Sequence, residues 1–151
     1  MICMNDKMKC FLCENSFNDK IDMKKLSDRI CSNTKYVNDC ILYNENESLS
    51  IKNINWKWVI QINGDYTGYE VNCNEIILPD EIFSVKNLLQ FLDELKKHFK
   101  NKYPNKNICF IFSYADKGFL RFHTYRAGEG LWLSSELDNY EEPVLYELDL
   151  Q

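Results

Sequence analysis

One stretch of the chain brings together residue types that can move protons. Over residues 119–126 an alternating pattern places Arg121, His123 and Tyr125 on one face of a predicted strand, and Glu129 follows after the next turn. A guanidinium, an imidazole, a phenol and a carboxylate held together could run acid–base chemistry on a phosphodiester, as ribonucleases do. A small hydrolase or nuclease that uses His123, Arg121, Tyr125 and Glu129 is therefore one hypothesis for this chain.

The same row of side chains has two simpler interpretations. A polar outer sheet face, stabilised by pairs of residues across neighbouring strands, would carry these residue types, and so would a face that binds a partner. The other histidine, His98, lies on a separate predicted helix, so the sequence does not place two histidines together. The polar outer face ranks first, the binding face second and catalysis third.

The cysteines offer a second kind of chemistry. The chain has seven cysteines, and Cys10-Phe-Leu-Cys13 forms a close pair with Cys3 before it and Cys31 and Cys40 after it. Thiolates of Cys3, Cys10, Cys13 and Cys31 could bind zinc in a tetrahedral site, which would give a zinc-stabilised interaction module. A second close pair is missing, because eight residues separate Cys31 from Cys40. We therefore expect unliganded thiols and keep zinc as an alternative.

The C-terminal part of the chain carries its charge imbalance. Residues 107–151 hold eight acidic and three basic residues, and their net charge of −5 equals that of the whole chain. Because aromatic and aliphatic residues lie among these acids, we expect a folded acidic surface and not a loose tail. Such a surface suits a basic protein and repels nucleic acid. Buried aromatic anchors with a charged rim are typical of tight interfaces. The predicted partner-binding residues are Glu129, Trp132, Glu136, Asp138, Tyr140, Glu141 and Glu142, with Arg121, His123 and Tyr125 as secondary contacts.

Composition limits the classes of protein to consider. With 151 residues, 45% of them hydrophobic and 14% aromatic, the chain can bury one packed core, and we expect a single domain. No apolar run reaches the roughly 18 residues of a membrane span, and the first residues do not resemble a secretion signal. The odd, irregularly spaced cysteines argue against a secreted disulfide framework. The sequence predicts a cytoplasmic protein without a phosphate-binding loop or a nucleophile elbow.

The clearest predicted element is an amphipathic helix over about 85–100. Ser84 is a suitable N-cap, and Pro104 follows the last turn. Its lysines, from Lys96 to Lys106, are expected to be a solvated helix end. The predicted apolar stripe consists of Val85, Leu88, Leu89, Leu92, Leu95 and Phe99.

Strands are predicted both before and after this helix in the sequence. Alternation over Trp56–Ile62, the turn Asn63-Gly64 and the run Tyr69–Cys73 predict a hairpin. Further strands are expected over 108–114, 119–126, 131–133 and, as an edge strand, 143–148. The first 53 residues are expected to be less regular, with a helix near 19–31 and a short strand at 41–43. The fold class is therefore α+β: one domain, 1–151, with an antiparallel sheet of hairpins packed on one long amphipathic helix within 54–151.

The C-terminal stretch resembles a known group of proteins. Phe122-His-Thr-Tyr-Arg126, then Glu129 and Leu131-Trp-Leu133, then Leu137 to Pro143-Val-Leu145 are similar to the end of small cytosolic immunity proteins. These are the antidotes encoded beside bacterial polymorphic and contact-dependent-inhibition toxins. The resemblance implies non-enzymatic inhibition of a basic toxin domain, commonly a nuclease, by covering its active site.

Overall fold

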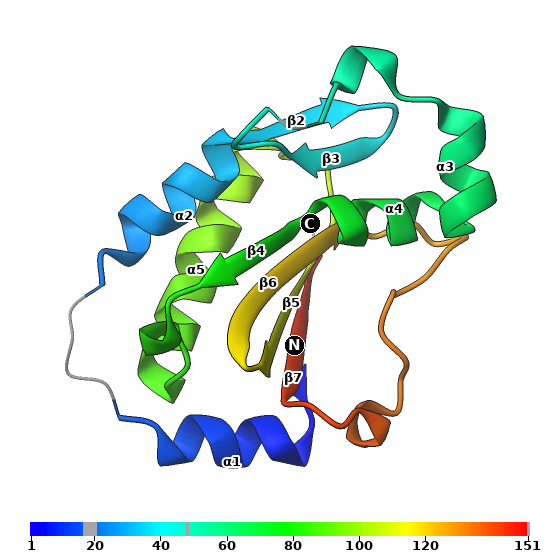
Figure 1. Cartoon of the computed structure of the whole chain (residues 1–151). Helices are drawn as coiled ribbons and strands as arrows, with labels where there is room; N and C mark the ends of the chain where they lie inside the picture. Colours follow the sequence, from blue (N-terminus) through cyan, green and yellow to red (C-terminus); the bar gives the residue numbers. More distant parts are fainter. Residues whose placement is uncertain (17–20, 48, 151) are drawn as a thin grey trace.

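Five strands form one antiparallel sheet in the order β1-β7-β5-β6-β4. In the computed structural model, which describes residues 1–16, 21–47 and 49–150, a two-stranded sheet of β2 and β3 lies beside it (Figure 1). The strands are β1 Ile2–Met4, β2 Thr34–Val37, β3 Cys40–Tyr43, β4 Glu75–Leu78, β5 Ile108–Ala115, β6 Lys117–Thr124 and β7 Val144–Asp149. The helices are α1 Asp6–Glu14, α2 Met23–Ser32, α3 Trp56–Asn63, α4 Tyr66–Cys73 and α5 Val85–Lys102.

The long helix α5 covers one face of the sheet, as the sequence predicts. Ser84 accepts a hydrogen bond from the backbone N–H of Asn87 (3.3 Å) and caps the first turn. The ring of Phe99 packs edge-on against Phe110 of β5 and Phe122 of β6, with centroids 5.2 and 5.0 Å apart. Helices α1 and α2 add their buried residues to the same core. The predicted α+β class and single domain are confirmed.

The opposite face of the sheet is covered by an irregular segment. Cys109 and Ile111 of β5 and Val144 of β7 pack on this face against Leu133 and Leu137. Residues 131–133 were predicted to be a strand, but they form no strand in the structure. The segment is held instead by its buried leucines and by a short 3-10 turn over Leu137–Asn139.

The predicted hairpin over 56–73 is wrong, because this region forms the two helices α3 and α4. The side chain of Asn55 accepts a hydrogen bond from the backbone N–H of Trp58, and Asp65 does the same for Gly68. Each therefore caps a helix. Gly64 ends α3 with a φ of +84°, a conformation that glycine adopts readily. Trp58, Ile60 and Ile62 of α3 are exposed.

The first 53 residues hold more regular structure than predicted. They supply β1 and α1 in addition to α2 and the β2–β3 hairpin, and their apolar residues belong to the main core. The expected helix near 19–31 corresponds to α2, and residues 19 and 20 lie outside the described residues. The expected edge strand at 143–148 is β7, which is internal because β1 pairs with its other side. No helix among the described residues is long and apolar enough to cross a membrane.

Candidate functional site

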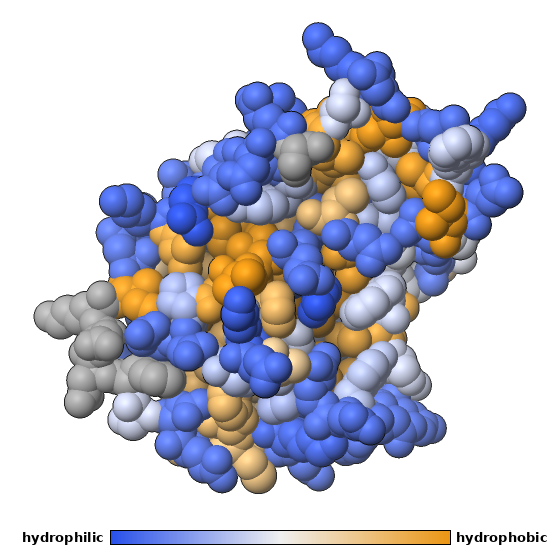
Figure 2. Space-filling model, viewed as in Figure 1, coloured by the Kyte–Doolittle hydropathy of each residue, from blue (hydrophilic) through white to orange (hydrophobic). Residues whose placement is uncertain are grey.

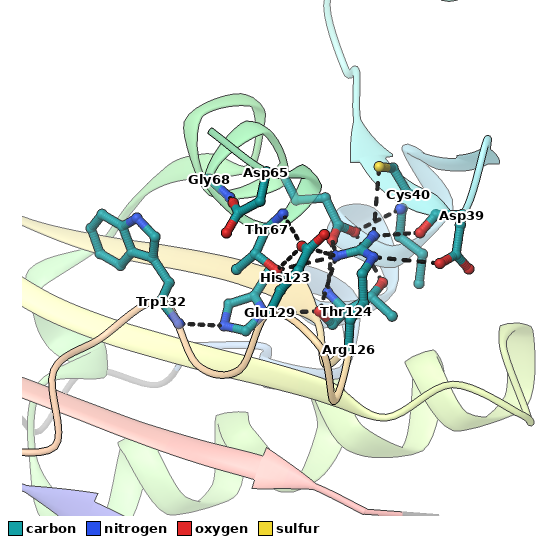
Figure 3. Close-up of polar contacts among 12 residues, drawn as sticks. Asp39, Cys40, Asp65, Thr67, Gly68, His123, Thr124, Arg126, Glu129 and Trp132 are labelled. Atoms are coloured by element: carbon teal, nitrogen blue, oxygen red, sulfur yellow. Dashed lines mark hydrogen bonds and ion pairs between the residues drawn. The ribbon is translucent and has the colours of Figure 1, made fainter. Parts of the chain in front are cut away.

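His123 is buried on the sheet face opposite α5, and both of its ring nitrogens have partners (Figure 3). Nδ1 donates to the carbonyl oxygen of Thr124 (2.9 Å), and Nε2 accepts from the backbone N–H of Trp132 (3.4 Å). Burial lowers the pKa of His123 below its usual value. A neutral imidazole in this position fastens the irregular segment to β6. It does not present a free nitrogen to a substrate.

Arg121 shares a sheet face with His123, but its charge is already paired. Its Nη2 lies 2.9 Å from a carboxylate oxygen of Glu75 on the neighbouring strand β4, and its Nη1 donates to the hydroxyl of Ser113 (3.0 Å). The guanidinium also lies over the ring of Phe119, with 5.2 Å to the centroid. Tyr125 lies just beyond β6, where its backbone N–H donates to the carbonyl of Asn107. The row predicted from the sequence therefore matches a paired outer face better than an acid–base centre.

A buried ion pair that the sequence did not reveal joins three elements. Glu70 of α4 is fully buried, and one of its oxygens lies 2.6 Å from Nη1 of Arg126. The same carboxylate accepts hydrogen bonds from the backbone N–H of Ile41 (2.8 Å) and from the backbone and hydroxyl of Thr124 (3.0 and 2.9 Å). Burial raises the pKa of Glu70, while Arg126 and the Ile41 N–H act in the opposite direction. We call these residues, with Thr67 and Glu129, the Glu70–Arg126 cluster.

Arg126 extends this cluster to the β2–β3 hairpin. Its Nη2 donates to the carbonyl oxygen of Asp39, and its Nη1 donates to the hydroxyl of Thr67 (3.3 Å). Burial opposes the positive charge, but the charges of Glu70 and Glu129 and the hydrogen bond to Glu70 act together to raise the pKa of Arg126 above its usual value. The guanidinium therefore stays charged and ties β6, α4 and β3 together (Figure 3).

Glu129, a predicted partner contact, also points inward. Its carboxylate accepts hydrogen bonds from the backbone N–H and the hydroxyl of Thr67 (2.9 and 2.7 Å), in the first turn of α4. Burial disfavours its charge, yet the bonds from Thr67 and the charge of Arg126 together hold the pKa of Glu129 below its usual range. The predicted turn is present, but Glu129 lies within it and not after it, because Arg126 and Gly130 on its two sides form an antiparallel bridge. Glu129 positions this turn and offers little to a partner.

Four of the predicted acids face outward from one segment. Glu136, Asp138 and Glu141 are exposed and Glu142 is half-buried. None of the four forms an ion pair with a cationic side chain in the part of the chain that the structure describes. We call residues 132–142 the acidic segment. In Figure 2 the lower right of the molecule, where this segment runs in Figure 1, is mostly hydrophilic.

Local contacts fix the backbone of the acidic segment. The hydroxyl of Tyr140 accepts a hydrogen bond from the backbone N–H of Ser134 (2.9 Å), and a carboxylate oxygen of Asp138 accepts one from Asp6 at the start of α1 (2.8 Å). Tyr140 is therefore half-buried against the sheet, whereas Trp132 has 45% of its surface exposed. Of the ten predicted contacts, this leaves Trp132, Glu136, Asp138, Glu141 and Glu142 on an accessible surface.

Two other C-terminal acids are neutralised by α5. A carboxylate oxygen of Glu147 lies 3.1 Å from the ammonium of Lys96, and Asp149 lies 3.6 Å from Lys100. Lys102 donates to the carbonyl oxygens of Cys31 (3.0 Å) and Thr34 (2.7 Å). The expected solvated lysine cluster at the end of α5 is therefore confirmed only in part. Lys97 and Lys100 are exposed, but Lys96 and Lys102 hold α5 to β7 and to the start of the β2–β3 hairpin.

The four candidate zinc ligands lie apart. Cys3 packs on the sheet face opposite α5, Cys31 of α2 is buried in the main core, and Cys10 and Cys13 are exposed on α1. Within residues 1–16, 21–47 and 49–150 no three histidine, cysteine, aspartate or glutamate residues are placed to hold a metal ion. All seven cysteines are free, and Cys73, expected in a strand, lies in α4.

Comparison with known proteins gives one match. The sequence model of the family described as "Uncharacterized protein PM0498 family" matches residues 3–150, which is nearly the entire chain. No curated protein matches the chain, and no solved structure does.

Proposed function

The chain belongs to the PM0498 family, and we propose that it is a non-enzymatic protein that binds a basic protein partner through the acidic segment. The observation that carries the proposal is the placement of Glu136, Asp138, Glu141 and Glu142, which project from a fixed backbone and form no ion pair with a cationic side chain among the described residues. Unpaired carboxylates on one surface attract a basic partner and speed its approach. The exposed ring of Trp132 at the start of the segment supplies an apolar anchor.

The more specific form of the proposal follows the resemblance to immunity proteins. The partner would be a basic toxin domain, and the chain would act in the cytoplasm by covering the active site of that toxin. The four carboxylates lie on the outer surface of the molecule, which suits a protein partner better than a small substrate. The hydrolase alternative finds less support, because His123 is buried and Arg121 is paired with Glu75.

Affinity capture with two neutralised variants tests the proposal. The first variant carries Glu136→Gln, Asp138→Asn, Glu141→Gln and Glu142→Gln. The control neutralises four acids elsewhere, so that both variants change the net charge equally: Asp28→Asn, Glu47→Gln, Asp93→Asn and Glu94→Gln. Each immobilised protein is exposed to lysate of its source cells, and bound proteins are identified by mass spectrometry.

The expected result is a basic protein that the natural chain and the control retain and the first variant loses. Its association rate with the purified chain should fall with rising salt, and about tenfold in the first variant, because long-range attraction governs encounter. Equal retention by both variants, or capture without a basic protein, would refute the proposal. Co-expression with a basic toxin domain encoded by a neighbouring gene then tests the more specific proposal, that the partner is a toxin and the chain inhibits it.

A further inference from the structure

Strand β1 is the free edge of the main sheet on the side of the acidic segment. It pairs with β7 on one side only. The backbone N–H of Asn5 donates to the carbonyl of Val144 on β7 (3.1 Å). Because backbone groups alternate in direction along an antiparallel strand, those of Cys3 also face β7, while those of Ile2 and Met4 face away from it. The residues of β1 are half-buried, and their outward backbone groups form no further hydrogen bond among the described residues.

Two hollows flank this edge, one on each side of the sheet. On the side of α5, a hollow of about 160 Å³ is bordered by Met4 of β1, Leu12 of α1, Leu145 of β7 and the exposed side chains of Val85 and Leu89. Its wall is apolar apart from Lys9 and the thiol of Cys13. Val85 and Leu89 belong to the apolar stripe predicted for α5, yet nothing in the described chain covers them fully.

The second hollow lies on the side of the acidic segment. It measures about 630 Å³ and is bordered by β1 and by residues 135–139, which include Glu136 and Asp138. Lys9 stands between the two hollows, and its ammonium lies 3.5 Å from Asp6. The edge of β1 therefore has an apolar hollow on one side and an acidic hollow on the other.

We propose that β1 is the docking edge for an extended segment of the partner, added antiparallel to the sheet, whose side chains alternate between apolar and basic. In a strand, successive side chains point to opposite faces. Apolar side chains would enter the hollow beside Leu89, and basic side chains would face Glu136 and Asp138. Backbone bonds to Ile2 and Met4 would supply affinity, and the two hollows would supply selectivity. The proposal rests on the proposed function, because it names the part of a basic partner that the acidic segment receives.

Charge and geometry together favour this occupant over others. An acidic or wholly apolar strand would leave Glu136 and Asp138 facing a like or uncharged neighbour, and a helix could not form backbone bonds with the edge. All four pairings of the main sheet are antiparallel, so an added antiparallel strand continues its pattern. In that arrangement the residue opposite Met4 points to the same sheet face as Met4, and its own N–H faces β1.

A blocked, fluorescent peptide of alternating valine and lysine serves as the probe, with fluorescence anisotropy as the readout. Its comparator has the same composition, with the lysines grouped at one end. We expect the alternating peptide to bind at least about tenfold more tightly than the comparator. N-methylation of the valines should abolish binding, because it removes the N–H groups that face β1, while N-methylation of the lysines should leave it unchanged. These peptides leave the protein untouched, so misfolding cannot produce the difference.

Two variants of the protein test the apolar hollow. Leu89→Trp fills it from an exposed position and should weaken binding about tenfold, while Gln90→Trp, on the next exposed position of α5, should not. Equal binding of both peptides, or equal effects of the two methylation patterns, would overturn docking at β1. The capture experiment can still succeed in that case, since it depends on the acidic segment alone. If capture fails while the alternating peptide binds, the edge is a docking site but the proposed function is wrong.

Discussion

The Glu70–Arg126 cluster and the acidic segment both draw on C-terminal charges, but they treat them in opposite ways. In the cluster, Glu70 is fully buried, Arg126 and Glu129 are half-buried, and the charges are paired within the fold with partners on α4, β6 and the β2–β3 hairpin. In the acidic segment, four carboxylates lie outside on a backbone that buried leucines hold in place. The comparison teaches that a count of acids in the sequence does not measure the charge offered to a partner, because position decides which acids are used within the fold.

The largest expected effect comes from breaking the cluster at Arg126. Arg126→Met leaves Glu70 buried without its charged partner and should lower the free energy of unfolding by about 3–5 kcal/mol. The double variant Glu70→Gln with Arg126→Met should lose less, because no unpaired charge remains buried. Chemical denaturation of the three proteins measures both values. A single variant no less stable than the double variant would contradict a structural role for this pair.

His123 links the two regions, and its replacement should have the next largest effect. His123→Phe leaves the N–H of Trp132 without its acceptor and should lower the free energy of unfolding by about 1–3 kcal/mol at neutral pH. Burial lowers the pKa of His123, so the unfolded chain binds the proton more tightly than the folded chain. The stability from this group is complete above the ordinary pKa of 6.5 and is lost as the pH falls through the lowered value.

The pH dependence supplies the control for that variant. Denaturation curves recorded from neutral pH downward should show a fall in the free energy of unfolding for the natural chain and for His98→Gln. The fall should be smaller for His123→Phe. The same loss in all three proteins would mean that His123 is not the group responsible.

Replacing Glu129 should lower the stability less than replacing His123 does, and this effect should depend on pH in the acidic range. Glu129→Ala removes both bonds to Thr67 and should lower the free energy of unfolding by about 1–2 kcal/mol. The bonds from Thr67 depress the pKa of Glu129, so this stability is present above the ordinary value of 4.5 and is lost as the pH falls below it. Glu129→Gln should therefore resemble the natural protein more closely at acidic pH than at neutral pH. A constant difference across that range would argue against this ionised contact.

The smallest effect on stability is expected in the acidic segment. Replacing Glu136, Glu141 and Glu142 by Gln and Asp138 by Asn should change the free energy of unfolding by no more than about 0.5 kcal/mol, since surface side chains without an ion-pair partner contribute little. The substitution Asp138→Asn keeps a side-chain oxygen that can accept from the N–H of Asp6. A loss comparable with that of Arg126→Met would remove the distinction between the two regions.

Local sequence signals account for the elements that were predicted correctly. The Ser84 cap and the spacing of Leu88, Leu92, Leu95 and Phe99 define α5, and the turn at Asp116 joins two alternating strands. Over Trp56–Ile62 the alternation of apolar residues predicted a strand, which was wrong. An alternating pattern also places apolar residues four positions apart, as an amphipathic helix does. Trp58 and Ile62 therefore fit one side of a helix as well as one face of a strand. The cap at Asn55 was the signal that could have decided for the helix.

The candidate site was predictable only in part, for a physical reason. The outward acids of the acidic segment are neighbours in sequence, so their grouping is visible without a structure. Glu70 and Arg126 are far apart in sequence, and nothing local marks Glu70 as a buried residue. The β1 edge was also hidden, because its importance depends on β7 pairing with a strand from the other end of the chain.

That pairing has a consequence for how the protein folds. Ile2 of β1 lies opposite Glu147 of β7, although most of the described chain separates them in sequence. Contacts across so long a stretch of chain form slowly, so we expect β1 to join the sheet late in folding. Until it does, β7 is a bare edge, and the surface beside β1 exists only in the fully folded molecule.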